Sequence, residues 1–185
     1  FRVAMIAVIM ALPLILPSIS VVKHLDNDLS AFRAAAAPRA ASGDFVFVAI
    51  DKKSLIEVGT WPWPRVVHAE LIDRLVASGA QDIFLDIDFS TPSQPENDVR
   101  LAKALEEAGG GVILPIFRQQ FGARSSDPLT VTAPLPIFAE HSWPALVDVA
   151  LDDDGLMRSF PVTELIDGIP TQSAPAVLAG YSDAR

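Results

Sequence analysis

Three aspartates, Asp51, Asp86 and Asp88, are the residues whose types and positions first suggest chemistry. Asp86 and Asp88 are two residues apart, so in an extended backbone their carboxylates point to the same face. Two carboxylates on one face repel each other unless a cation or a proton separates them. We therefore predict a ligand site at these aspartates, or a site for a hard cation if the protein binds any metal. The alternative is that Asp51 and Asp88 cap the turns that follow them and that Asp86 alone is buried.

A second group of candidates lies between the first predicted strand and the first predicted helix. Trp61 and Trp63 alternate with two prolines, which restrict the backbone and leave this segment little conformational freedom. The segment lies beside the predicted aspartate site, so the indoles could contribute to ligand binding. The alternative is that both tryptophans pack over the core as a lid.

Arg65 and His68 complete this group. The guanidinium of Arg65 fits a carboxylate, so we expect it to pair with Asp86 or Asp51, either in a ligand site or as a buried structural ion pair. His68 lies at the start of the predicted helix, where the helix dipole disfavours its protonation. A neutral imidazole can act there as a ligand or as a hydrogen-bond partner. The three histidines of the chain lack the spacing of a zinc site.

The elements that position these residues are predicted from hydrophobic periodicity. Residues 45–50 (Phe-Val-Phe-Val-Ala-Ile) are continuously apolar, which is typical of a central strand covered on both faces. Further strands are predicted at 81–89 and 111–117, and amphipathic helices at 66–78 and 97–108. Three strands that alternate with two helices form a right-handed βαβαβ unit. Ligands of such sheets bind beyond the carboxyl ends of the strands, which is where the three aspartates lie.

The carboxy-terminal part of the chain has a different pattern. The apolar stretches 145–150 and 157–166 flank the turn-rich residues 152–155 (Asp-Asp-Asp-Gly), which predicts an antiparallel hairpin. Thr171 can cap a final helix that ends near Tyr181. The predicted fold class is therefore α/β, with a mixed, mainly parallel sheet, helices on both faces and a transmembrane helix before the sheet.

Composition excludes some functions. The formal net charge is −9, from 14 basic and 23 acidic residues, and Lys and Arg form no cluster. A nucleic-acid partner is therefore not expected. The chain has no cysteine, which excludes disulfides and thiolate metal sites.

An uncharged apolar run, residues 3–22, is long enough to cross a bilayer as a helix. A cleaved signal peptide is the alternative, but its apolar core is usually shorter. Arg2 precedes the run and favours a cytoplasmic amino terminus. We therefore predict a transmembrane helix over 1–23, a stalk or linker over 24–43, and an extracytoplasmic (periplasmic) domain over 44–185 at the cell inner membrane.

The predicted stalk offers a second class of function. Leu25, Leu29 and Phe32 recur at helical spacing, so this segment is expected to be an amphipathic helix. Receptors with one leading helix commonly signal as dimers. A homodimer is therefore expected, and a purely structural dimerisation module is one alternative function.

An enzyme is the third class. Residues 84–90 (Phe-Leu-Asp-Ile-Asp-Phe-Ser) resemble the Asp-x-Asp-x-Thr/Ser loop of haloacid-dehalogenase-like phosphatases, in which the first aspartate is phosphorylated and the second is the acid/base. Such an enzyme needs magnesium and a later acidic pair. Asp152 and Asp153 come late enough, but they lie in a predicted hairpin turn. This hypothesis makes Asp86 and Asp88 catalytic.

Several motifs occur in the order found in a known sensory family. They are Val48-Ala49-Ile50-Asp51-x-x-Ser54-Leu55, Gly59-x-Trp61-Pro62-Trp63-Pro64-Arg65-x-x-His68, Asp86-x-x-Phe89, Val112-Ile113-Leu114-Pro115 and Asp154-Gly155-x-x-Arg158. In this combination the sequence resembles the type-two CHASE domain, the cyclase/histidine-kinase-associated sensory extracellular domain, over about residues 44–180.

The resemblance implies an extracytoplasmic sensor that is preceded by one membrane helix. It also implies a cytoplasmic output module beyond Arg185, such as an adenylate or guanylate cyclase, a diguanylate cyclase, a histidine kinase or a Ser/Thr kinase. The sensor itself is then no enzyme, needs no cofactor, and responds to a small-molecule or protein stimulus. The candidate ligand-binding or structural residues are Asp51, Ser54, Trp61, Trp63, Arg65, His68, Asp86 and Asp88.

Overall fold

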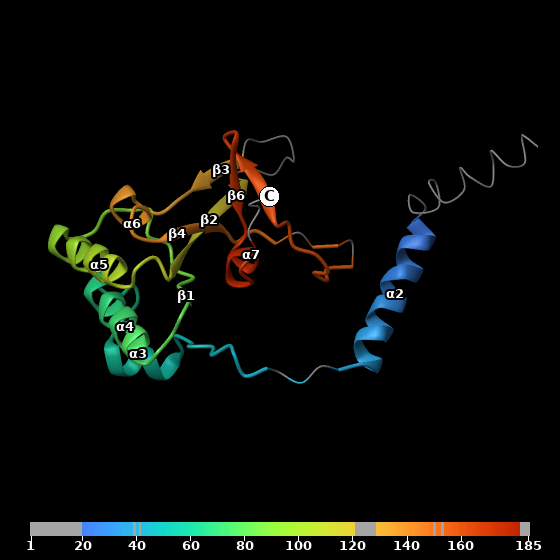
Figure 1. Cartoon of the computed structure of the whole chain (residues 1–185), viewed down its shortest axis with the longest axis horizontal. Helices are drawn as coiled ribbons and strands as arrows, with labels where there is room; N and C mark the ends of the chain where they lie inside the picture. The colour runs from blue at the N-terminus through green and yellow to red at the C-terminus, as the bar shows by residue number, and fades with distance from the viewer. Residues whose placement is uncertain are drawn as a thin grey trace, which may run out of the picture. The chain divides into compact units, whose positions relative to one another are not determined.

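The computed structural model divides the chain into two compact units, Phe1–Ile50 and Asp51–Arg185. The residues that it describes are 20–38, 40, 42–120, 129–149, 151–152 and 154–181. The first unit contains helix α2, Ser20–Ala36 (Figure 1). This helix confirms the helical spacing predicted for the stalk, and it leaves Leu29 and Phe32 exposed by 51% and 70%.

Most of the predicted membrane segment, residues 3–22, lies outside the described residues. Within the described part of the chain, no helix combines the length and the apolar character that a membrane span needs.

The second unit is built on a mainly parallel sheet. Strands β1 (Ile83–Phe84), β2 (Val112–Gln120) and β4 (Trp143–Leu146) run parallel, with β2 between the other two. Strand β3 (Leu129–Thr132) pairs antiparallel with the carboxy-terminal half of β2. The sheet is therefore mixed and mainly parallel, as the sequence predicts.

Two long helices cover one face of this sheet. Helices α4 (Arg65–Ala77) and α5 (Pro95–Glu107) pack against each other and confirm the two predicted helices (Figure 1). Ile72 of α4 and Leu105 of α5 are fully buried, and they belong to one core cluster with Leu114 of β2. Burial of these apolar side chains is the main stabilising contribution to this layer.

The other face of the sheet is covered by the last helix. Side chains alternate along a strand, so Ile113 points away from α4 and α5. It packs with Ala145 of β4 and with Ala174 of α7 (Ala174–Leu178). Helices therefore lie on both faces, as predicted. The short helices α3 (Lys52–Val58) and α6 (Pro136–Ala139) complete the second unit.

The antiparallel hairpin exists, but it lies later in the chain than predicted. Strands β5 (Thr163–Ile166) and β6 (Ile169–Gln172) pair with each other around Asp167 and Gly168. Both turn residues have positive φ angles, of 50° and 82°. An Asp-Gly loop of this kind matches the twist of the two strands, whereas the predicted turn at 152–155 joins no pair of described strands.

The predicted first strand is wrong. Residues 45–50 form no strand, and Phe45 and Phe47 are exposed by 76% and 92%. An apolar, β-branched composition favours a strand, but a strand also needs a neighbour that satisfies its backbone groups. The predicted βαβαβ unit is therefore reduced to a βαβ unit with β4 added beside β2.

Two further boundaries differ from the prediction. The strand predicted at 81–89 is short, because the chain leaves the sheet soon after the hydrogen bond from Leu85 N to Ile113 O at 3.1 Å. Thr171 lies in β6 and does not cap the final helix, which follows Ser173.

Candidate functional site

Arg65 does not pair with Asp86 or Asp51. Its Nε lies 3.2 Å from Oδ1 of Asp98, and its Nη2 donates to the carbonyl of Thr91. Both ionic side chains are almost completely buried. Arg65 thus forms a buried ion pair with a carboxylate, as predicted, but the partner predicted for it is wrong. The partner is Asp98, because the first turn of α5 faces the start of α4.

The carboxylate of Asp98 is held by further hydrogen bonds. Ser93 donates to it twice, from its backbone N at 3.0 Å and from its Oγ at 2.6 Å. Burial raises the pKa of Asp98, but the hydrogen bonds from Ser93 and the charge of Arg65 outweigh this effect and lower the pKa below its ordinary value. Asp98 is therefore ionised at neutral pH.

Aromatic rings enclose the Arg65 guanidinium. It lies 5.2 Å from the ring centroid of Phe89 and 4.9 Å from that of Phe138. Such contacts stabilise a cation by about 0.5–2 kcal/mol, with the larger value for desolvated groups. Nη1 of Arg65 is buried and finds no hydrogen-bond partner among the described residues. Burial lowers the pKa of Arg65, and the charge of Asp98 partly offsets that effect.

Trp61, Trp63 and His68 pack together at the amino-terminal end of α4. The ring centroids of Trp61 and Trp63 are 5.6 Å apart, and His68 lies 5.7 Å from Trp61 and 6.2 Å from Trp63. His68 also contacts Phe89 edge-on at 5.5 Å. The indole N–H of Trp63 donates to the carbonyl of Gly59 at 2.7 Å, so it is anchored within its own segment.

His68 is buried, with 2% of its surface exposed. Burial lowers its pKa, and the positive charge of Arg65 lowers it further. The prediction of a neutral imidazole is therefore supported, although burial is the principal cause and the prediction invoked the helix dipole. Nδ1 of His68 is buried without a hydrogen-bond partner in the described part of the chain.

Asp51 is a helix cap. Its carboxylate accepts from Ser54 N and from Ser54 Oγ, both at 2.9 Å, and Ser54 Oγ accepts from Asp51 N at 3.4 Å. This reciprocal arrangement is a capping box at the start of α3. The backbone hydrogen bond from Ser54 is the main reason that the pKa of Asp51 is lowered. The capping alternative therefore describes Asp51, and the strand-end position predicted for it is wrong.

Asp86 and Asp88 also do not assemble a site with Asp51. Asp88 accepts a hydrogen bond from Ser90 N at 2.8 Å, which is the turn-capping role of the alternative interpretation. The burial that this interpretation predicts for Asp86 is wrong, since Asp86 is exposed. Among the described residues, no three acidic, histidine or cysteine side chains converge as a metal site needs. The described residues therefore do not assemble the cation site predicted at these three aspartates.

The acidic turn near residue 152 is closed by an arginine. Arg158 donates to Asp152 at 2.8 Å and to both carboxylate oxygens of Asp154 at 2.8 and 2.7 Å. The Arg158 hydrogen bonds lower the pKa of Asp154 to about 2. Asp153 lies outside the described residues. Asp152 is therefore paired with the Arg158 guanidinium and does not supply a free acid for a phosphatase.

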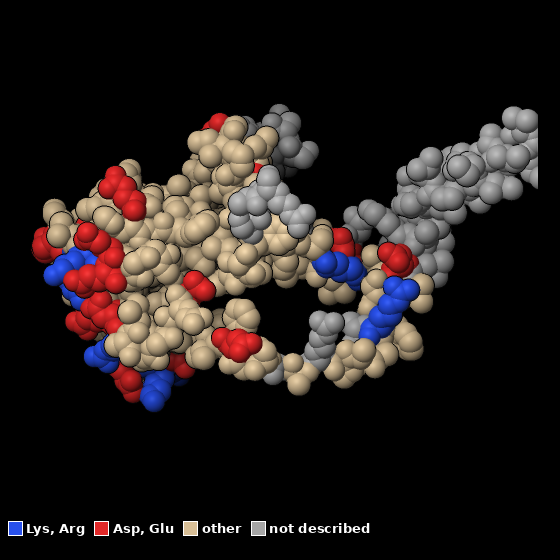
Figure 2. All heavy atoms as spheres, in the orientation of Figure 1, with Lys and Arg blue, Asp and Glu red and all other residues tan. Residues whose placement is uncertain are grey.

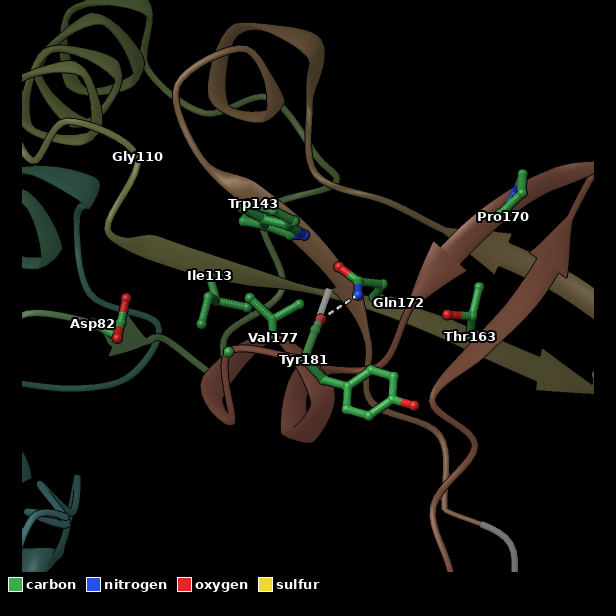
Figure 3. A pocket seen from close by; sticks show the side chains of 10 residues that line it. Asp82, Gly110, Ile113, Trp143, Thr163, Pro170, Gln172, Val177 and Tyr181 are labelled. Carbon is green, nitrogen blue, oxygen red and sulfur yellow. Dashed lines mark hydrogen bonds between the residues drawn. The ribbon is translucent and has the colours of Figure 1, made fainter. Parts of the chain in front are cut away.

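A cleft of about 540 Å³ lies at the other end of the parallel strands (Figure 3). Asp82 precedes β1, Gly110 precedes β2 and Trp143 begins β4, so the cleft is at the amino-terminal ends of these strands. Gln172 and Tyr181 also line it. The predicted position, beyond the carboxyl ends, is therefore not where this cleft lies.

The family of the chain follows from a comparison with family models. The model of the CHASE2 domain matches residues 3–183. The chain belongs to the CHASE2 family. CHASE2 domains are extracellular sensory domains and are not catalytic. No curated protein and no solved structure matches the chain.

This membership confirms the family resemblance seen in the sequence. The CHASE2 motif residues Trp61, Trp63, Arg65 and His68 meet around the start of α4, where Arg65 and His68 are buried and Trp61 is 42% exposed. Sequence reasoning does not identify Asp98 as the partner of Arg65, although an acidic residue in the first turn of a helix is a signal for capping or pairing. It also missed the cleft, whose residues are far apart in the sequence and follow no common motif.

Proposed function

We propose that this CHASE2 domain is the extracytoplasmic ligand-input domain of a membrane receptor that regulates a cytoplasmic output module. The match of the CHASE2 model to residues 3–183 carries the proposal, because this family is sensory and extracellular. The output is a cyclase, a diguanylate cyclase, a histidine kinase or a Ser/Thr kinase. The stimulus is a small molecule or a protein.

The contacts of the aspartates in the second unit favour a sensor over an enzyme. Asp51 caps α3 and Asp98 neutralises Arg65, so these carboxylates have structural partners. Asp88 is engaged by Ser90 N, and Asp152 by Arg158. The later acidic pair that a haloacid-dehalogenase-like phosphatase needs would include Asp152, which is already bound by Arg158.

The absence of cysteine makes the topology testable with one introduced thiol. Lys103 lies on the outer face of α5, where its side chain is 65% exposed. In intact cells, Lys103→Cys is expected to react with a membrane-impermeant maleimide. Labelling that occurs only after lysis would place this domain inside the cell and would reject the proposal.

A matched control lies at the next position of the helix. Ala104 is 1% exposed, so Ala104→Cys is expected to stay unlabelled until the protein is denatured. Rapid labelling of Ala104→Cys in the native protein would show that the thiol assay reports unfolded chains. The parent chain, which has no thiol, gives the background.

We further propose that the receptor is a homodimer that associates through α2. The observation that favours this is the exposure of Leu29 and Phe32, which are three residues apart and therefore on one side of the helix. Exposed apolar side chains at this spacing are typical of a helix that packs against a second helix.

The dimer can be tested by disulfide crosslinking at this face. Leu29→Cys is expected to crosslink to a second copy under mild oxidation, whereas Asp28→Cys, one residue away on another side of α2, is expected to crosslink much less. Equal crosslinking at both positions would reject a specific interface. As a control, Phe32→Glu is combined with Lys103→Cys, and the maleimide labelling of the introduced thiol is expected to stay unchanged.

A further inference from the structure

The cleft between β4, the β5–β6 hairpin and α7 has the size of a small-molecule site. Its volume is about 540 Å³, and ligand pockets typically measure about 300–1,000 Å³. It lies within the second unit of the chain, away from Arg65 and His68. Figure 3 shows the side chains that surround it, which come from strands, a helix and the turns before β1 and β2.

The middle of the cleft is apolar. Ile113, which is 2% exposed, and Val177 of α7 lie next to each other there (Figure 3). Two aromatic side chains, Trp143 and Tyr181, lie on either side of this apolar patch. They are 49% and 56% exposed, so a ligand between them would remove a large apolar area from water.

Asp82 and Gln172 supply acceptor oxygens to the cleft. Asp82 is the only carboxylate among the lining residues, and its side chain forms no ion pair or hydrogen bond with the described residues. The amide nitrogen of Gln172 donates to the backbone carbonyl of Tyr181 at 2.7 Å. This bond fixes the amide so that its oxygen points toward Trp143 (Figure 3).

None of the described residues that line the cleft is a lysine, an arginine or a histidine. The formal net charge of the chain is −9. In Figure 2 charged side chains gather over α4 and α5. An anion therefore finds no counter-charge in the cleft. A cation finds the carboxylate of Asp82 and the electron-rich faces of two aromatic rings.

We propose that this cleft binds a small organic cation, an ammonium group carried on an apolar or aromatic body. The apolar body lies between Trp143 and Tyr181 over Ile113 and Val177, and the ammonium group is directed to Asp82. The inference deepens the proposed function, since it assigns the ligand-input site of the sensor and the class of its ligand. The inference rests on the proposed function only in treating ligand binding as a signal; binding in the cleft does not depend on that function.

The probe is 2-phenylethylammonium, and the comparison probe is 3-phenylpropionate, which has a similar body and a negative charge. The chain contains three tryptophans, Trp61, Trp63 and Trp143, and only Trp143 lines the cleft. The full chain is reconstituted in lipid nanodiscs with 5-fluorotryptophan, and the three fluorine signals are assigned with Trp143→Phe. The ammonium probe is expected to shift the Trp143 signal saturably and to leave the other two signals in place.

Two variants test the charge and the ring. Asp82→Asn is expected to weaken binding of the ammonium probe about threefold to fivefold, the effect of a partly exposed ion pair. Trp143→Leu is expected to weaken it about tenfold or more, read from the Tyr181 side with 3-fluorotyrosine, since Tyr181 is the only tyrosine. Asp86→Asn, at the other end of β1 and outside the cleft, is the matched control and is expected to bind as the parent chain does.

The outcomes separate this inference from the proposed function. If 3-phenylpropionate binds as tightly as the ammonium probe, or if Asp82→Asn changes nothing, the cation assignment is wrong. If neither probe shifts Trp143 at millimolar concentration, the cleft is not the proposed site. Either result leaves maleimide labelling at Lys103→Cys unaffected, and that labelling alone decides the topology of the sensor.

Discussion

Arg65 at the first position of α4 and Asp98 in the first turn of α5 form a buried ion pair, with Nε 3.2 Å from Oδ1. This pair ties together the amino-terminal ends of the two helices that cover one face of the sheet. The guanidinium also donates to the carbonyl of Thr91, in the segment between β1 and α5. One side chain thus joins three parts of the CHASE2 domain.

The first prediction concerns this pair. Arg65→Ala and Asp98→Ala are each expected to lower the free energy of unfolding by about 3–5 kcal/mol, because each leaves an uncompensated buried charge. The double variant is expected to lose less than the sum of the two single losses. The measurement is urea denaturation of all three variants.

The control for this prediction is the more exposed pair of Arg100 and Asp73, whose side chains are 33% and 38% exposed. Arg100→Ala is expected to cost about 1 kcal/mol or less. Equal losses for Arg65→Ala and Arg100→Ala would contradict the role given to the buried pair.

The second prediction is a pH dependence due to His68. Burial lowers its pKa in the folded protein, while the unfolded chain titrates at the ordinary value of 6.5. Below pH 6.5 the unfolded state therefore binds a proton that the folded state does not. The stability from the neutral imidazole is complete above pH 6.5 and declines as the pH falls below it, by up to about 1.4 kcal/mol per pH unit.

Urea denaturation at pH 7.5 and pH 5.5 checks this expectation. His68→Phe keeps an aromatic ring beside Trp61 and Phe89 but cannot titrate, so its stability is expected to change less between the two pH values. The pKa of Asp98 is lowered from 3.8, so its contribution is lost only in more acidic solution. An equal decline in the parent chain and in His68→Phe would contradict the prediction.

The third prediction concerns the close approach of two backbone segments before β1 and β2. A Cβ atom at Gly111 would lie 2.7 Å from the carbonyl oxygen of Gln81. Gly111→Ala is therefore expected to lower the free energy of unfolding by about 1–3 kcal/mol, since the two segments have to separate. Thermal unfolding followed by circular dichroism measures the effect.

Gly109 provides the comparison for Gly111. Its φ is +65°, but a Cβ atom there meets nothing within 4 Å. Gly109→Ala is expected to cost about 1 kcal/mol from the left-handed backbone alone. A larger loss for Gly109→Ala than for Gly111→Ala would show that the backbone contact is not tight.

The fourth prediction concerns Arg118, which links the hairpin to the sheet. Arg118 of β2 forms ion pairs with Asp148, after β4, and with Glu164 of β5. The hydrogen bond that Arg118 donates to Asp148 is the main reason that the pKa of Arg118 is raised, and the one that it donates to Glu164 comes next. Arg118→Met is expected to cost about 1–3 kcal/mol and to speed amide hydrogen exchange in β5 and β6.

Lys103 is the matched control for Arg118. Its ion pair with Glu107 joins exposed side chains along one helix at 3.6 Å. Lys103→Met is expected to leave exchange in the hairpin unchanged and to shift stability by about 0.5 kcal/mol or less. Unchanged exchange in Arg118→Met would show that the hairpin is held by its other contacts.

The sequence predicts the helices of this domain well. The apolar stripe ending at Gly79 identifies α4, and that ending at Gly109 identifies α5, because helix periodicity and a glycine stop are local properties. The CHASE2 motif is equally local, and it identifies Trp61, Arg65 and His68 as candidate residues without assigning them a role. Ser54 and Asp51 form their capping box within one turn, so that pattern also belongs to the sequence.

Partners that are far apart along the chain were decided only by the tertiary structure. Asp98 lies 33 positions after Arg65, and nothing in the sequence ranks it above Asp86 or Asp51 as the partner. The choice depends on which helix ends meet when α4 and α5 pack. The exposed position of residues 45–50 has the same cause, since apolar composition cannot say whether a segment finds a neighbouring strand.

The sequence by itself determined the family, the main helices and the local caps, because these follow from short-range spacing and from motif order. The tertiary structure alone decided the Arg65–Asp98 pair and the cleft lined by Asp82, Trp143 and Tyr181. The physical reason is that a pairing or a cavity is a property of surfaces brought together by packing. Residues that meet there need no common spacing along the chain.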